Sequence, residues 1–356
     1  MNPNLELAPE IIVDGVGAVS PAGWGVASLL AALKGPDPLP LSELQRPGWQ
    51  KPLRVRRVPP DSLRPGFISH GRLRRTSPIT HYTVAAALEA LGNTATWVSN
   101  GALRLGIIFC TMSGCVNYSR RFYDETLRNP ATASPLVFPE TVFNAPSSHL
   151  AAVLGATAIN YALVGDPGTF LQGIALAAHW LLDEQVDGCV IIGAEELDWL
   201  TADAFLHFDR QISLSEGAGA IYLRRGSDAG STVQLGAVTD PQLYSRRATR
   251  TEALKSVRLQ LPQYAERTLL CDSAPNQLDA VECAVWKDWP GRRITPKAMI
   301  GDGLMASSAW QCIAAIEALR DGDLDTALVS VAGCNEQAIG ASFLRRNRTP
   351  STPNLA

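Results

Sequence analysis

The chain has 356 residues, of which 46% are hydrophobic and 18% charged, a balance typical of one large globular domain or two fused domains. A formal net charge of −3 and the lack of a basic stripe interleaved with aromatic residues exclude nucleic acid as an expected partner. No segment is apolar for long enough to span a bilayer, and the first ten residues do not resemble a signal peptide. We therefore expect no membrane partner.

The cysteines and histidines give no sign of a metal site. Seven cysteines, an odd number, lie mostly in apolar runs without CxxC or metal-ligand spacing, which is typical of reduced thiols in a cytoplasmic protein. The five histidines form no cluster. Gly15 and Gly17, followed by Gly23, do not match the GxGxxG dinucleotide fingerprint. We expect neither a metal ion nor a cofactor.

The first third of the chain predicts alternating strands and helices. Residues 11–13 indicate a short strand that turns at Gly15 and Gly17, and residues 26–33 indicate a helix. Residues 35–66, rich in proline and arginine, predict a long surface excursion. An amphipathic helix is expected over residues 74–91.

The next elements follow the same alternation. They are predicted as a buried strand over 105–110, a polar loop or lid over 117–135, a serine-capped helix over 147–155, a strand over 161–164 and a helix over 169–182. Residues 345–356, which are polar and contain proline, predict a disordered tail.

An internal similarity links the two halves of the chain. A helix over 174–182 leads to Asp187 and a strand over 189–192, and a helix over 309–319 leads to Asp325 and a strand over 327–331. Both strands end in small residues. A repeated unit of this kind implies two α/β halves with mostly parallel sheets.

Several segments resemble, in the same order, those of the β-ketoacyl synthases of the thiolase superfamily. Residues 13–21 (VDGVGAVSP) resemble the first strand and turn, and residues 144–149 (NAPSSH) resemble the loop before the nucleophile strand. Residues 216–219 (EGAG) resemble the family's Gly-Glu-Gly-Ala-Gly strand, and residues 296–301 (PKAMIG) its lysine motif. The resemblance covers nearly the whole chain and implies a thiolase fold, with two pseudo-repeated α/β halves in five αβαβα layers.

The resemblance also implies domain limits. Residues 1–224 correspond to the N-terminal ketosynthase-like half, residues 225–345 to the C-terminal half, and residues 346–356 to a tail.

The resemblance implies a site with four groups: a cysteine that carries the acyl chain, two histidines that stabilise the enolate, and a lysine that orients them. Counting back from Asp187, the cysteine position falls on Pro167. Asp272 stands at the first histidine position and Asp302 at the second. Only Lys297 matches the pattern.

These substitutions argue against condensation. Pro167 has neither a nucleophile nor the backbone N–H that in the family donates to the acyl oxyanion hole. Loss of a nucleophile costs about 10⁶ in rate. An aspartate accepts hydrogen bonds where the reaction needs a donor, and at about 4 Å and an effective dielectric of about 20 it opposes an enolate by roughly 4 kcal/mol. We expect neither ordinary condensation nor decarboxylation.

Asp272, Lys297 and Asp302 are expected to converge in the folded chain. One interpretation is an ion-paired cluster that fills an abandoned site, because buried charges persist chiefly when paired. The other is a rebuilt acid/base pair, in which crowding raises the pKa of one carboxylate. The second lacks an obvious nucleophile, since Cys271 lies in an apolar run and Cys115 is a weaker candidate still.

Three functions follow as hypotheses. The resemblance favours a non-condensing subunit of the chain-length-factor type, which pairs with an active ketosynthase in fatty-acid or polyketide biosynthesis, completes the acyl pocket and limits product length. The alternatives are an acyl-thioester enzyme with the rebuilt site and a stand-alone acyl-binding homodimer that serves as a scaffold.

Three further expectations concern partners and access. The resemblance implies a subunit interface formed by a strand pair around residues 166–171 and their neighbours. The compact stretch between Glu216 and Asp272 implies a closed or vestigial substrate tunnel. A basic set would suit an acidic acyl carrier protein, although a solvated basic face fits the same pattern; it comprises Arg246, Arg247, Arg250, Lys255 and Arg258.

Overall fold

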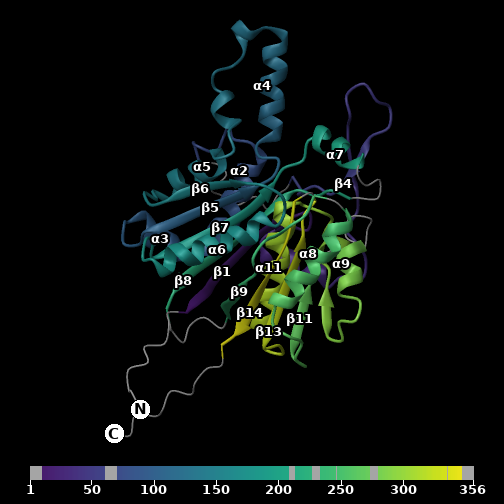
Figure 1. The fold of residues 1–356 in the computed structure, drawn as a ribbon. Coiled ribbons are helices and arrows are strands. Elements are labelled where there is room, and N and C mark those ends of the chain that lie inside the picture. The colour runs from purple at the N-terminus through teal and green to yellow at the C-terminus, as the bar shows by residue number, and fades with distance from the viewer. Residues whose placement is uncertain are drawn as a thin grey trace.

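The computed structural model describes residues 10–60, 70–207, 213–226, 233–245, 247–272, 280–334 and 336–346. Its sheet consists of two halves with the same strand order (Figure 1). Across the first half the order is β1 (Ile11–Ser20), β8 (Gly217–Arg225), β7 (Gly188–Glu195), β5 (Leu105–Thr111) and β6 (Asn160–Val164). Across the second half it is β9 (Val233–Val238), β14 (Gln337–Arg345), β13 (Thr326–Ala332), β11 (Thr268–Cys271) and β12 (Arg292–Ile294).

The direction of the strands also repeats. In each half the first two ladders are antiparallel and the last two are parallel. The expectation of mostly parallel sheets is therefore wrong. The sequence repeat ended with β7 and β13 and did not include the strands that follow them, β8 and β14. These two strands run antiparallel to β7 and β13.

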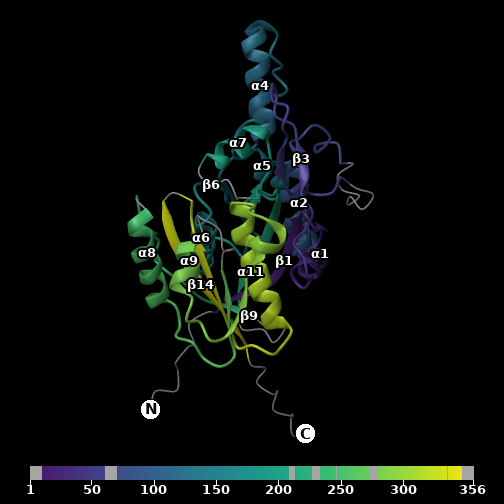
Figure 2. The same cartoon turned by 90° about the vertical axis from the view of Figure 1, so that its right-hand side faces the viewer.

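The helices complete five layers. One outer layer is formed by α2 (Pro78–Leu91), α3 (Thr94–Ser99) and α5 (Ala145–Leu154), and the other by α8 (Arg247–Gln260) and α9 (Ala280–Val285). Between the two sheet halves lie α6 (Thr169–Leu182) and α11 (Met305–Arg320), which are the repeated helices (Figure 2). The predicted αβαβα arrangement is confirmed.

The first strand does not turn at its glycines. β1 runs unbroken from Ile11 to Ser20, with one irregularity between Val13 and Gly15. A Cβ on Gly15 would lie 1.9 Å from the carbonyl oxygen of Ala90 in α2. The glycines therefore allow a helix to pack closely on this strand. In the sequence, glycines that allow such packing look the same as glycines that form a turn.

Replacing one of these glycines is expected to destabilise the fold. In Gly17→Ala the new methyl would lie 2.0 Å from the oxygen of Ala86, so the helix and the strand must separate. We expect a loss of about 2–3 kcal/mol in the free energy of unfolding, measured by urea denaturation. Gly71→Ala is the matched control, since a Cβ there meets nothing within 4 Å; an equal loss in both variants would contradict this account.

A helical arm projects from the end of the first sheet half (Figure 1). It contains α4 (Val116–Arg128) and two short 3₁₀ turns, η2 (Pro130–Thr132) and η3 (Phe138–Glu140). The predicted polar loop over 117–135 is thus wrong for most of its length. Spaced ion pairs within α4, Arg120 with Asp124 and Arg121 with Glu125, support a helix that has no buried side chain.

The remaining predicted elements agree with the structure apart from their limits. α1 (Val26–Leu33) and the predicted 169–182 helix have the expected bounds, whereas α2 begins at Pro78 and is buried on most sides rather than amphipathic. α5 begins at Ala145, with Asn144 rather than a serine at its cap. The expected tail begins with the end of β14, and residues 347–356 lie outside the described residues.

The smaller elements complete the described chain. They are the hairpin β3 (Ser42–Leu44) and β4 (Leu53–Val55) within the expected surface excursion, the short strands β2 (Gly23–Trp24) and β10 (Gln242–Leu243), and the helices α7 (Trp199–Leu206) and α10 (Pro296–Ile300). Residues 61–66 of the excursion lie outside the described residues. Among the helices of the described parts, none is both long and apolar enough to cross a membrane.

Candidate functional site

The head of α6 is the place where the sequence resemblance puts a nucleophile. β6 ends at Val164, and after Gly165 the chain enters the helix through Asp166, Pro167 and Gly168, all three of them buried. Pro167 has no side-chain nucleophile and no N–H. The chemistry of this position is therefore determined by its neighbour, Asp166.

Asp166 is 3% exposed and accepts four hydrogen bonds, all from N–H groups. Its Oδ1 accepts from the Gly168 amide at 3.1 Å and from Nε2 of Gln337 at 3.0 Å. Its Oδ2 accepts from the amides of Glu336 and Gln337, both at 3.2 Å. Four N–H donors match an ionised carboxylate, which only accepts. No pattern in the sequence predicted this role of Asp166.

The residues around Asp166 fix its position. Gly333 lies so close that an added Cβ would be 1.7 Å from Oδ2 of Asp166, so only glycine fits there. The Tyr244 hydroxyl donates to the carbonyl of Gly333. Nε2 of Gln172 in α6 donates to Oε1 of Gln337 at 3.0 Å, which orients the Gln337 amide toward Asp166. The head of α6 is thereby joined to the turn between β13 and β14.

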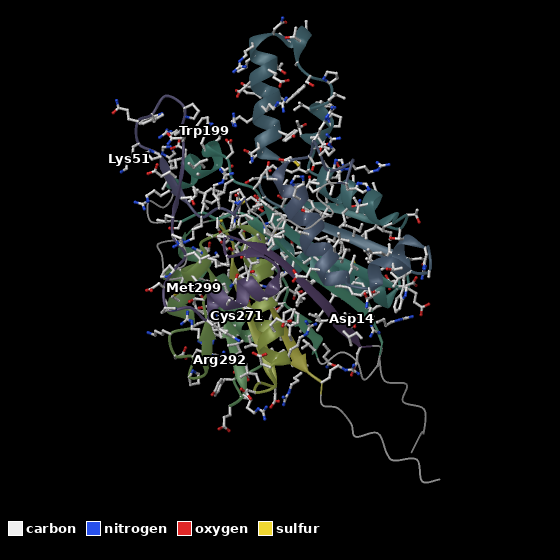
Figure 3. All side chains as sticks on the ribbon, turned by 180° about the vertical axis from the view of Figure 1, so that it is seen from behind. Asp14, Lys51, Trp199, Cys271, Arg292 and Met299 are labelled. Atoms are coloured by element: carbon white, nitrogen blue, oxygen red, sulfur yellow. The ribbon has the colours of Figure 1, made fainter. Side chains whose placement is uncertain are left out.

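Asp272 follows the carboxyl end of β11 and is fully buried. It forms an ion pair with Arg293 of β12, the strand that runs parallel to β11. Cys271, beside it, lies within the body, while Arg292 lies toward the end of the molecule opposite the arm (Figure 3). Residues 273–276, where the family resemblance continued, lie outside the described residues. The sequence analysis did not anticipate Arg293 as the partner.

Lys297 and Asp302 form a second buried ion pair. The Nζ atom of Lys297, in the short helix α10, lies 3.1 Å from Oδ2 of Asp302, and the side chains are 3% and 7% exposed. Oδ1 of Asp302 accepts from the Leu304 amide at 2.9 Å. The geometry thus joins two of the three predicted residues directly, and it gives the third, Asp272, an arginine partner.

The two thiols considered as replacement nucleophiles, those of Cys271 and Cys115, are buried in apolar surroundings. Burial raises the pKa of the Cys271 thiol, and Asp272 raises it further. Burial, followed by the charges of Glu196, Glu140 and Glu195, raises the pKa of Cys115. Both thiols therefore stay protonated at neutral pH, which disfavours nucleophilic attack.

Two buried glutamates that the sequence analysis missed lie at the end of β7. Glu195 accepts from the amides of Met112, at 2.5 Å, and Ser113, and burial raises its pKa to about 8. Glu196 accepts from the Ser77 hydroxyl and from the amides of Ile79 and Asn117, and burial raises its pKa to about 7. Since Met112, Ser113 and Asn117 begin the arm, these carboxyl groups hold its base.

The three described basic side chains of the expected carrier-protein surface on α8 are each either buried or ion-paired. Arg250 is 4% exposed, Lys255 pairs with Glu252 at 3.0 Å, and Arg258 pairs with Asp288 at 2.7 Å. Arg246 and the side chain of Arg247 lie outside the described residues. Three of the five predicted basic side chains are thus buried or ion-paired.

Residues 166–171, at the centre of the predicted subunit interface, do not lie on the surface of the single chain. All six residues are buried, because they form the start of a helix between the two sheet halves. The edge of the first half is β6 instead, and its Tyr161 and Val164 are 53% and 51% exposed. In the predicted region and its neighbours, β6 is therefore the strand that exposes large side chains.

A cavity of about 630 Å³ lies beside α2. Its described walls include Trp24, Tyr82, Arg57 and Glu216, with several prolines. Arg57 and Glu216 neutralise each other, since Nε of Arg57 donates to Oε1 of Glu216 at 3.2 Å. Asp166, Asp272, Lys297 and Asp302 are not among its described wall residues.

Comparison with known proteins places the fold. No family model and no curated protein matches the sequence. Solved structures do match: the ishigamide ketosynthase/chain length factor at a TM-score of 0.78 and 16% identity, covering 95% of this chain and 100% of that one. A β-ketoacyl synthase from Burkholderia phymatum matches at a TM-score of 0.75 and 15% identity, covering 95% of this chain and 100% of that one. A third match is the AntDE ketosynthase bound to the hexaketide, in complex with its type II polyketide synthase acyl-carrier protein AntF. Its TM-score is 0.75 at 15% identity, and the match covers 96% of this chain and 100% of that one. The chain therefore has the ketosynthase-like thiolase fold that its sequence predicted.

Proposed function

We propose that this chain is a non-condensing subunit that pairs with an active ketosynthase in the cytoplasm and shapes the acyl pocket of the pair. The observation that carries the proposal is the head of α6, where Pro167 replaces a nucleophile and a buried carboxylate binds the nearby N–H groups. A protein of this fold with such a site has no means of holding an acyl chain by a thioester bond. A role as a partner requires no such bond.

Exposed apolar side chains support a partner surface. Thr111 at the end of β5 pairs with Val164 at the end of β6, so the edge strand and the base of the arm lie side by side. The arm exposes a set of large apolar side chains: Tyr123, Leu127, Leu136, Phe138, Val142 and Phe143. An edge strand next to such a patch is a surface that pairing with another chain would cover.

The three charged residues of the altered site support a structural rather than a catalytic role. Asp272 is ion-paired with Arg293, and Lys297 with Asp302. Apolar side chains also pack together near the carboxyl ends of the strands, among them Leu197, Leu214 and Leu304, which supports a closed tunnel. The acyl-thioester enzyme with a rebuilt site is thus the weaker candidate.

The proposal predicts a one-to-one complex on co-expression with a ketosynthase encoded beside this chain. Leu136→Asp, at a side chain 68% exposed on the arm, is expected to weaken this complex about tenfold or more, because it places a charge in the covered patch. Leu259→Asp is the matched control, since Leu259 is 78% exposed on α8. The two affinities are compared by titration of purified chains.

The same samples separate the three functions. Malonyl transfer that requires both chains supports the partner role. If this chain instead forms a homodimer that is weakened by Leu136→Asp and does not bind the ketosynthase, the acyl-binding scaffold replaces the partner role. Thioester turnover by this chain alone, lost in Asp272→Ala, would establish the rebuilt enzyme instead.

A further inference from the structure

The hydrogen bonds of Asp166 have the geometry of a bound anion rather than of a surface ion pair. The donors come from two segments far apart in sequence: Gly168 at the start of α6, and residues 336–337 at the start of β14. None of them is a cation. Converging amides at the positive end of a helix dipole form a site suited to a carboxylate or to another oxyanion.

The site is built around this one group. Gly333 is in contact with Oδ2 of Asp166 and leaves no room for a side chain, and the Gln337 amide is held in place by Gln172. The hydroxyl of Thr169 also accepts from Nε2 of Gln337, at 3.3 Å. The groups that surround the Asp166 carboxylate are therefore themselves held in place by neighbouring residues, as in a preorganised binding site.

We infer that Asp166 is a built-in ligand: its carboxylate fills an anion site formed by Gly168, Glu336 and Gln337, and it closes the head of α6 to any external acyl oxygen or carboxylate. The chain thus carries a latent site for a small carboxylate. This inference does not depend on the proposed partner role, because it concerns contacts within one chain.

Chemical rescue tests the inference. Asp166→Gly removes the side chain and opens its space, so the variant should unfold at a lower temperature than the original chain. Formate, a carboxylate small enough for that space, is expected to raise the unfolding midpoint of the variant by about 2–4 °C in a saturable way. Sodium chloride at equal ionic strength should have no such effect.

Two controls distinguish site binding from a general effect of salt. Formate should leave the midpoint of the unsubstituted chain unchanged, and likewise that of Asp183→Gly, which alters an exposed aspartate at the other end of α6. Equal formate stabilisation of all three proteins, or none in Asp166→Gly, would overturn the inference.

A second measurement applies if Asp166→Gly does not fold. Asp166→Asn keeps the shape of the side chain but has a single acceptor oxygen, so its NH₂ group faces either the Gly168 amide or the amides of Glu336 and Gln337. Hydrogen exchange at the amides that the NH₂ group faces should speed up at least tenfold. Addition of formate should not reverse this, because the amide side chain still fills the site. Unchanged exchange at all three amides would show that Asp166 is not their acceptor.

Discussion

The free energy of unfolding is expected to fall as pH rises from about 4.5 to about 8. In the folded chain burial raises the pKa of Glu195 from 4.5 to about 8 and that of Glu196 to about 7. Between the unfolded and folded pKa values the folded state binds more protons, so raising the pH favours unfolding. Each group contributes a slope of roughly 1.4 kcal/mol per pH unit within its own window.

A substitution isolates the contribution of Glu195. Glu195→Gln imitates the protonated acid, so it should remove the slope between about pH 7 and 8, where Glu195 alone still titrates. Because both oxygens of Glu195 accept from backbone amides, the glutamine turns its NH₂ group toward one donor, and the variant should be less stable than the unsubstituted chain at pH 5. Its stability relative to the unsubstituted chain should rise by a few kcal/mol between pH 5 and pH 8.5. Urea denaturation at a series of pH values measures both profiles.

The control is a glutamate outside the core. Glu43→Gln changes an exposed side chain on β3, and it should leave the pH profile as it was. Parallel profiles for the unsubstituted chain and for Glu195→Gln would mean that Glu195 is ionised in the folded state throughout, and the account of its burial would be wrong.

The arm should respond before the rest of the molecule. Glu195 and Glu196 bind the amides of Met112, Ser113 and Asn117, and Asp198 binds Arg120 of α4 at 2.7 Å. Ionisation of buried carboxyl groups favours hydration over burial. Hydrogen exchange should therefore increase first at the base of the arm as pH rises, which links this region to the proposed pairing surface.

The parts of the fold that were predictable are those encoded by nearby residues. The bounds of α6 and the match between the two halves follow from apolar periodicity and from small residues after each strand. The arm was missed because α4 buries none of its side chains and is anchored by Asp198, 78 residues from Arg120 in sequence. Periodicity carries no information on such an anchor.

For the residues assigned to the family's site, the sequence did not predict the partners that the structure gives them. Position matching assigns Pro167, Asp272 and Asp302 to the family's cysteine and histidine positions, and this assignment stays a prediction. The partners depend on strand register: Leu270 faces Arg293 across two parallel strands, which brings Arg293 to Asp272. The turn between β13 and β14 likewise brings its amides to Asp166. Neither arrangement has a local sequence signal.

The second large effect is expected at the Lys297–Asp302 pair. Lys297→Met removes one charge of a buried pair and leaves the Asp302 carboxylate without its cation, which should lower the free energy of unfolding by about 3–5 kcal/mol. Lys297→Met combined with Asp302→Asn should recover a substantial part of this loss, because no unpaired charge then remains. The asparagine keeps an oxygen for the Leu304 amide.

A matched exposed pair shows what burial contributes. Lys255 and Glu252 form an ion pair at 3.0 Å on α8, with side chains 57% and 70% exposed, and Lys255→Met should change stability by no more than about 0.5 kcal/mol. Denaturant titration of Lys297→Met, Asp302→Asn, their combination and Lys255→Met beside the original chain gives both differences. If the combined variant loses as much as the two single substitutions added together, Lys297 and Asp302 act independently and the pair is not the source of the effect. If Lys297→Met is as mild as Lys255→Met, water reaches Asp302, and a rebuilt acid/base site would regain support.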